Sequence, residues 1–197
     1  MAEITIPTIK QSRAEFRLVR KDQVNQLMSG SDVVTAFPRA VWAQSIPLVI
    51  QTEDGGRVWS ARLAQLSSLG NYFKARPPGY YGAQYSATTL QVNGSGQLGL
   101  SLDIKGASAG VTVLRIGEFF EVNGEVKIVT DDCTANGSGL ATVQFEPALR
   151  SSPSNSSNLE TQNPQIKWRL RSPEGVWSIV PGRFYEFNLE VVEAVYA

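Results

Sequence analysis

The dipeptide Asn123-Gly124 gives the sharpest local signal in the chain, because a strand-like run flanks it on each side. Phe119 to Val122 precedes it and Glu125 to Val129 follows it. Asn-Gly is the pair that tolerates φ > 0 at both central positions of a type I′ turn. The sequence therefore predicts a tight β-hairpin over residues 119–129.

This hairpin lies in a longer stretch, residues 80–150, that is rich in Gly, Ser, Thr and Val and poor in helix formers. Alternating apolar residues predict further strands in it, at residues 88–92, 98–104, 111–116 and 141–145. A second turn signal, Asn-Gly-Ser-Gly, falls at residues 136–139. Several short strands with regular turn signals are typical of a small β-barrel of the OB or SH3 kind, or of a sandwich.

One helix is expected, over residues 58–74. Its apolar side chains recur at spacings of three and four residues, at Trp59, Leu63, Leu66 and Phe73, as on a helix that packs against a sheet. Asp54, in the turn before it, is a candidate cap, and Pro77-Pro78 ends it.

The rest of the chain outside residues 80–150 favours strands. Strand-like runs cover residues 15–19, 33–38, 42–50, 166–170 and 184–191. The last is long and aromatic, so we expect it to be central in its sheet. Between the first two runs, a polar stretch over residues 21–31 shows helical spacing at Val24, Leu27 and Met28.

These segments predict a mainly β protein with one helix, in two modules. Residues 1–78 and 160–197 form one discontinuous domain, a β-sandwich or split barrel that holds the helix 58–74. Residues 80–150 form an inserted small β-barrel, and residues 151–159, rich in serine, form a flexible loop. Neither flank has enough strands to make a core alone.

Composition excludes several function classes. The chain has no histidine, which removes Ser-His-Asp and Cys-His catalysis and histidine-ligated metals. Lys+Arg and Asp+Glu number 18 each, and a neutral chain without a basic stripe argues against nucleic acid as a ligand. Neutrality also removes one barrier to self-association. No run of residues is long and apolar enough to span a bilayer, and we expect no membrane partner.

The remaining candidates for chemistry are weak. Asp131-Asp132 fails the spacing of a calcium loop and is better interpreted as a solvated strand end. Gly94-x-Gly96-x-x-Gly99 lies between strands and opens no helix, so it is not a dinucleotide motif. Cys133, the single cysteine, is expected in a turn, inert or merely exposed. We therefore expect no catalytic, cofactor-binding or metal-binding residues, no cofactor and no enzymatic activity. The tyrosine-rich cluster Tyr72, Phe73, Tyr80, Tyr81 and Tyr85 fits an interface, a core or a sugar platform.

Parts of the chain resemble distal tail proteins of long-tailed bacteriophages. The resemblance rests on the segments Val113–Gly124, Val129–Asp132, Asn136–Arg150 and Tyr185–Ala194, and it extends over residues 56–197. Membership of that family implies a structural virion protein at the tail tip, made in the host cytoplasm. It also implies a homo-oligomeric ring, usually a hexamer, that joins the tail tube to the hub and receptor-binding proteins.

Three other interpretations stay open. A tail-tube or tail-completion subunit would also be β-rich and oligomeric, and a carbohydrate-binding β-module would use the tyrosines. An enzyme that works through carboxylates alone ranks last.

Overall fold

The computed structural model describes residues 2–20, 23–26, 30, 32–35, 40–68, 70–85, 89–172, 174 and 177–195. In this part of the chain the fold is mainly β, with a single helix and several sheets, one of which forms a half-barrel. The chain divides into two compact units. The first unit comprises Met1–Leu18, Trp42–Pro78 and Ile166–Ala197, and the second comprises Val19–Val41 and Gly79–Gln165. Residues 19–41 and 160–165 were predicted to lie in the discontinuous domain, but they fall in the second unit.

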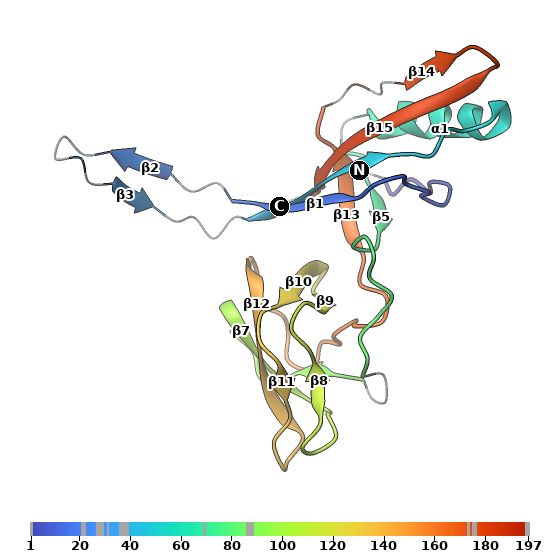
Figure 1. Cartoon of the computed structure of the whole chain (residues 1–197). Helices are drawn as coiled ribbons and strands as arrows, with labels where there is room; N and C mark the ends of the chain where they lie inside the picture. The colour runs from blue at the N-terminus through green and yellow to red at the C-terminus, as the bar shows by residue number, and fades with distance from the viewer. Residues whose placement is uncertain are drawn as a thin grey trace. The chain divides into compact units, whose positions relative to one another are not determined.

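The described elements occur in a fixed order along the chain (Figure 1). They are β1 (Glu15–Val19), β2 (Gln23–Gln26), β3 (Asp32–Thr35), β4 (Val41–Pro47), α1 (Glu53–Leu66), β5 (Phe73–Ala75), β6 (Gln91–Val92), β7 (Gly99–Lys105), β8 (Thr112–Leu114), β9 (Phe119–Val122), β10 (Glu125–Val129), β11 (Cys133–Thr134), β12 (Leu140–Leu149), β13 (Ile166–Leu170), β14 (Trp177–Val180) and β15 (Phe184–Glu193).

The first unit is a six-stranded sheet with α1 packed beside its central strand. The strand order is β1-β4-β15-β13-β5, and β14 pairs with β15 outside that path. The prediction that the last strand is central is confirmed. α1 lies along β15 in Figure 1, with the Trp59 ring 6.3 Å from that of Phe187. Trp59, Leu63 and Leu66 on α1 are buried, as the apolar spacing predicted.

The N-terminal boundary predicted for the helix is wrong. α1 begins at Glu53, so residues expected to form a turn and a cap lie inside the helix. Glu53 and Asp54 occupy its first turn, where acidic side chains interact favourably with the helix dipole. Gly56 is buried against Tyr185: an ideal Cβ there would lie 2.2 Å from Cγ of the tyrosine ring. The absence of a side chain at position 56 therefore allows the helix to pack closely against the sheet, and this glycine does not form a turn.

The predicted C-terminal boundary is also wrong, because α1 ends at Leu66 rather than near residue 74. Asn71 caps this end by donating from Nδ2 to the Gln65 carbonyl at 2.8 Å. Phe73 does not belong to the helix. It starts β5, pairs with Trp168 of β13 and is fully buried in the sheet core.

The helical spacing read into residues 21–31 is wrong where the structure describes them. Gln23–Gln26 form β2, which pairs antiparallel with β3 from Gln23↔Thr35 to Gln26↔Asp32. The spacing within residues 21–31 does not reveal the pairing with β3, which comes from residues later in the chain. Leu27, Met28 and Pro38 lie outside the described residues.

The second unit is a five-stranded curved sheet with the order β6-β7-β12-β10-β9, and β8 pairs with β11 beside it. The hairpin predicted over residues 119–129 is confirmed: Val122 pairs with Glu125 across a turn in which Asn123 has φ 52° and Gly124 has φ 74°. Phe120 and Phe145 meet edge to face at 5.4 Å in the core.

The end of the serine-rich segment closes this sheet, in contrast to the flexible loop expected there. Asn158 bridges to Gln91 on β6, and Glu160 bridges to Glu121 on β9. Leu159 between them is buried in the core. Residues 158–160 thus hydrogen-bond to both edges of the five-stranded sheet. We call residues 156–160 the closing segment.

The Asn123-Gly124 turn makes a stability prediction. Gly124→Val should destabilise the second unit by about 2 kcal/mol, because a β-branched residue resists a left-handed φ. Gly137→Val is the matched control, since Gly137 has no positive φ and its Cβ would meet nothing within 4 Å. Urea unfolding followed by circular dichroism should show a loss for the first variant and almost none for the second.

The two adjacent helix glycines should respond in opposite directions. Gly56→Ala should destabilise the first unit by about 1–3 kcal/mol, because the methyl group collides with Tyr185. Gly55→Ala should be neutral or stabilising by up to about 1 kcal/mol, because its nearest neighbour is the flexible end of Gln51. The four tryptophans, Trp42, Trp59, Trp168 and Trp177, all lie in the first unit, so their fluorescence reports its unfolding selectively. Equal effects of the two variants would contradict this account of Gly56.

Candidate functional site

The residues that the sequence singled out as possible sites of chemistry have structural roles. Asp132 accepts a hydrogen bond from the Ile116 backbone N–H at 2.8 Å and so holds a turn. The glycines Gly94, Gly96 and Gly99 all have positive φ. The first two lie in the connection from β6 to β7, and Gly99 is the first residue of β7, so the motif opens a strand rather than a helix. Among the described residues, no group of three or more His, Cys, Asp or Glu side chains is arranged to hold a metal ion.

Cys133 is neither exposed nor in a turn, which corrects the prediction. It lies in β11, pairs with Leu114 of β8 and is buried in the core of the second unit. Burial raises the pKa of its thiol to about 11. The thiol is therefore protonated at neutral pH, and a protonated, buried thiol is a poor nucleophile.

The residues of the tyrosine-rich cluster are divided between the two units. Tyr72 and Phe73 belong to the first unit, and the other three tyrosines belong to the second. The hydroxyl of Tyr80 lies 2.9 Å from the carbonyls of both Phe119 and Thr161, which share its single proton. Burial raises the pKa of Tyr80 to about 12. Tyr85 is hydrogen-bonded to Ser108. Tyr81 is 88% exposed.

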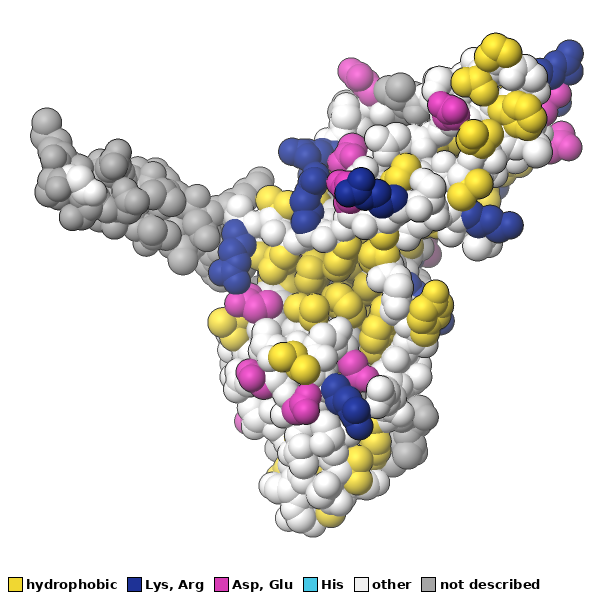
Figure 2. Space-filling view, viewed as in Figure 1, with side chains coloured by type: hydrophobic (Ala, Val, Ile, Leu, Met, Phe, Trp, Pro, Cys, Tyr) yellow, Lys and Arg dark blue, Asp and Glu magenta, His cyan; other side chains and the backbone are white. Residues whose placement is uncertain are grey.

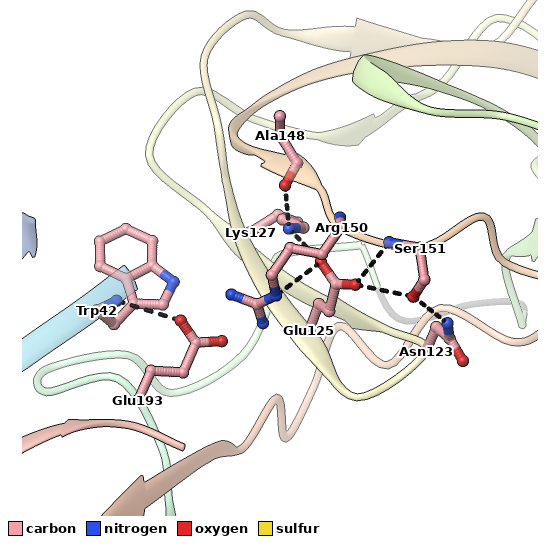
Figure 3. Close-up of polar contacts among 8 residues, drawn as sticks. All are labelled: Trp42, Asn123, Glu125, Lys127, Ala148, Arg150, Ser151 and Glu193. Carbon is pink, nitrogen blue, oxygen red and sulfur yellow. Dashed lines mark hydrogen bonds and ion pairs between the residues drawn. The ribbon is translucent and has the colours of Figure 1, made fainter. Parts of the chain in front are cut away.

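Sequence reasoning missed a buried charge cluster in the second unit (Figure 3). Lys127 is fully buried, and its Nζ donates to Glu125 Oε2 at 2.7 Å and to the Ala148 carbonyl at 2.9 Å. Glu125 also accepts from the backbone N–H groups of Arg150 at 3.1 Å and Ser151 at 3.2 Å. Asn123 in the hairpin turn donates to Ser151 Oγ at 2.9 Å. The cluster ties β10 to the end of β12.

The electrostatics of this cluster favour structure over catalysis. Burial alone would raise the pKa of Glu125, but the hydrogen bond and charge of Lys127, together with Arg150, hold that pKa below its ordinary value. A carboxylate that stays ionised and accepts several hydrogen bonds is a poor general acid. Charged and apolar residues alternate in Glu125-Val126-Lys127-Ile128, and this alternation was a possible sequence signal for the charge cluster. In a sequence taken alone, however, the same alternation indicates a strand whose charged face is exposed to solvent.

A second buried carboxylate, in the first unit, also has a structural role. Glu193, near the end of β15, accepts from the Trp42 backbone N–H at 3.2 Å (Figure 3). It lies opposite Trp168 in the sheet register. Phe16 stacks on Trp42 with ring centroids 4.6 Å apart and meets Trp168 edge-on. This group belongs to the core of the sheet.

Exposed apolar side chains lie on the β14–β15 hairpin in the first unit. Trp177 and Phe184 are partly exposed, and Ile179 is 58% exposed. Hydrophobic side chains gather in Figure 2 where Figure 1 places α1 and the turn between these strands. Trp177 and Ile179 continue the sheet face of Phe187 and Tyr185, which are their partners in register. α1 covers that face at β15 but leaves it open at β14. This hairpin end is a candidate interaction surface.

A small hollow lies beside the same strand. Its volume is about 150 Å³, and it is lined by Leu63, Leu170, Ser172, Glu174, Asn188, Leu189 and Glu190. Sites for cofactors and drug-sized ligands are larger, roughly 300–1,000 Å³. The hollow has room for a single side chain rather than for such a ligand.

The only helix in the described part of the chain, α1, has 14 residues, and no described helix is long and apolar enough to cross a membrane. Comparison of the chain with models of known protein families and with curated proteins gives no match.

The charge cluster makes a testable stability prediction. Lys127→Met should destabilise the second unit by about 3–5 kcal/mol, because it leaves the Glu125 carboxylate buried without its ammonium partner. Glu125→Gln/Lys127→Met, which removes both charges and keeps an acceptor for Ser151, should lose less than the single variant. Thermal unfolding by circular dichroism, with amide exchange on β10, measures both. A loss below about 1 kcal/mol for Lys127→Met would contradict this account of the cluster.

Proposed function

We propose that the chain is a non-enzymatic structural protein that assembles with copies of itself, as a ring component of a phage tail tip. The observation that carries the self-association is the exposed apolar end of the β14–β15 hairpin. Trp177 and Ile179 are exposed on one face of the hairpin, and Phe184 is exposed next to its turn. Large exposed apolar side chains of this kind mark interaction sites. The neutral charge of the chain opposes association less than a strongly charged surface would.

The tail-tip role is supported by the resemblance of residues 56–197 to distal tail proteins. In this proposal the first unit, with its discontinuous sheet and helix, forms the ring, and the second unit is the inserted barrel. The ring joins the tail tube to the hub and receptor-binding proteins. The two buried charge sites described above make structural contacts, which fits a protein whose function lies in its surfaces.

A tail-tube subunit is the second candidate, because it would use the same apolar surface for head-to-tail stacking. A sugar-binding role has less support. Of the tyrosines proposed as a platform, only Tyr81 is strongly exposed, and stacking platforms need a broad aromatic face.

The assembly prediction can be tested on the purified full chain at high concentration. Native mass spectrometry should show a closed oligomer, with six copies expected, and negative-stain electron microscopy should show rings. Long tubes would favour the tail-tube alternative. A chain that stays monomeric at every concentration, in both measurements, would contradict the proposal that this surface serves self-association.

A further inference from the structure

We propose that Phe184, at the turn of the β14–β15 hairpin, inserts into the hollow beside β15 of a neighbouring copy. This inference rests on the proposed function, since it names the two surfaces through which copies of the chain would meet. It assigns the contact to two parts of the first unit that differ from each other.

The hollow exists because β15 changes partners along one of its sides. On that side β14 pairs with Phe184–Phe187, and β13 pairs with Val191–Glu193. Residues 188–190 lie between the two pairings and border the hollow. Leu63 from α1, Leu170 and Leu189 provide an apolar lining, and Ser172 and Glu174 provide polar groups. A cavity of about this volume can hold a benzene ring. The volume of the hollow and its three leucines therefore suit one phenyl group, and the other four lining residues are polar.

Phe184 is suited to be that group. It is 44% exposed and follows the turn Pro181–Arg183 directly. Val180 pairs with it across the turn, and Arg183 Nη1 forms an ion pair with Glu53 Oε2 of α1 at 3.2 Å. These contacts fix the turn before any partner binds. A turn that is already ordered loses little backbone entropy on docking.

The charges near the two surfaces are complementary. Arg183 and Arg57 share the single carboxylate of Glu53, so a second carboxylate could pair with one of these guanidinium groups. At the hollow, Glu174 makes no ion pair within the described part of the chain. Docking of Phe184 would bring an arginine towards this carboxylate. Such a pair would add orientation more than affinity.

The occupant must come from another copy rather than from the same chain. Phe184 and Leu189 lie on one continuous strand, five residues apart, which corresponds to about 16 Å. β15 cannot fold its own end back into its middle. Two copies could exchange their Phe184 side chains about a two-fold axis, whereas the same contact repeated head-to-tail generates rings or filaments. The proposed function requires a ring, so we assign the contact to the head-to-tail arrangement.

Single-cysteine cross-linking tests the contact directly. Phe184→Cys and Ser172→Cys chains are prepared separately, with the buried Cys133 retained, then mixed and oxidised. Disulfides between the two variants should form in larger yield than disulfides within either variant alone, because the contact joins unlike surfaces. Dominant Phe184→Cys homodimers would overturn the inference, since they indicate that position 184 lies against position 184 of the neighbouring copy rather than in its hollow. Absence of mixed disulfides in samples whose wild-type chain forms oligomers would overturn it while leaving the proposed function intact. A wild-type chain that never forms oligomers would overturn both.

A matched pair of substitutions measures the contribution of the side chain. Phe184→Ser should weaken self-association at least about tenfold, as loss of an aromatic anchor from a pocket does. Leu98→Ser is the control, because Leu98 is 60% exposed and lies in the second unit. It should leave self-association unchanged. Tryptophan fluorescence during unfolding should show that the first unit is intact in both variants. Equal affinities of the Phe184→Ser and wild-type chains would overturn the inference.

Discussion

The first unit depends on the pairing of β15 with strands from distant parts of the chain. β4, from residues 41–47, pairs with Asn188–Val192 on one side of β15. β13 and β14, from residues 166–180, pair on the other side. Such a sheet cannot form until segments more than a hundred residues apart meet, so much of the loop-closure entropy is lost before the contacts stabilise the fold. The helix depends on the same strand, because Gly56 and Trp59 pack on Tyr185 and Phe187.

The second unit contains a curved sheet of five strands, and the outer strands of such a sheet need hydrogen-bonding partners. An open sheet leaves unpaired backbone groups on both outer strands. Here the closing segment pairs with β6 through Asn158 and with β9 through Glu160, and Leu159 enters the core. One short run of chain therefore satisfies both edges. Its composition concealed this role, because a single apolar residue among serines and asparagines gives no alternating pattern.

The features that sequence predicted correctly are those fixed by neighbouring residues. Asn123-Gly124 specifies its hairpin within a few positions, and the aromatic run at residues 184–191 identifies a strand buried enough to be central. The features that it missed depend on distant partners. The start of α1 was misplaced because the reason for Gly56 is a tyrosine 129 residues later in the chain. Lys127 looked like a solvated side chain because its carbonyl partner, Ala148, comes from another strand.

The edges of the first unit's sheet differ in how they are protected, and this difference bears on where association can occur. β1 carries ion pairs between Arg13 and Glu15 and between Arg17 and Glu190, and charged edges discourage strand pairing. The segment that leads into β5 is bonded to the N-terminal residues, through Ile4 to Tyr72 and Tyr72 to Ala2.

The edge of β14 is protected in neither of these ways. Its sequence, Trp-Ser-Ile-Val, contains no charge and no proline, and within the described residues it pairs with β15 alone. An edge of this kind is a liability in a monomer, because it exposes both backbone groups and large apolar side chains. In the proposed assembly the same edge directs association to the hairpin. In the second unit, by contrast, the closing segment is bonded to both outer strands of the five-stranded sheet. The open edge of β14 is therefore the reason for proposing that association occurs through the first unit.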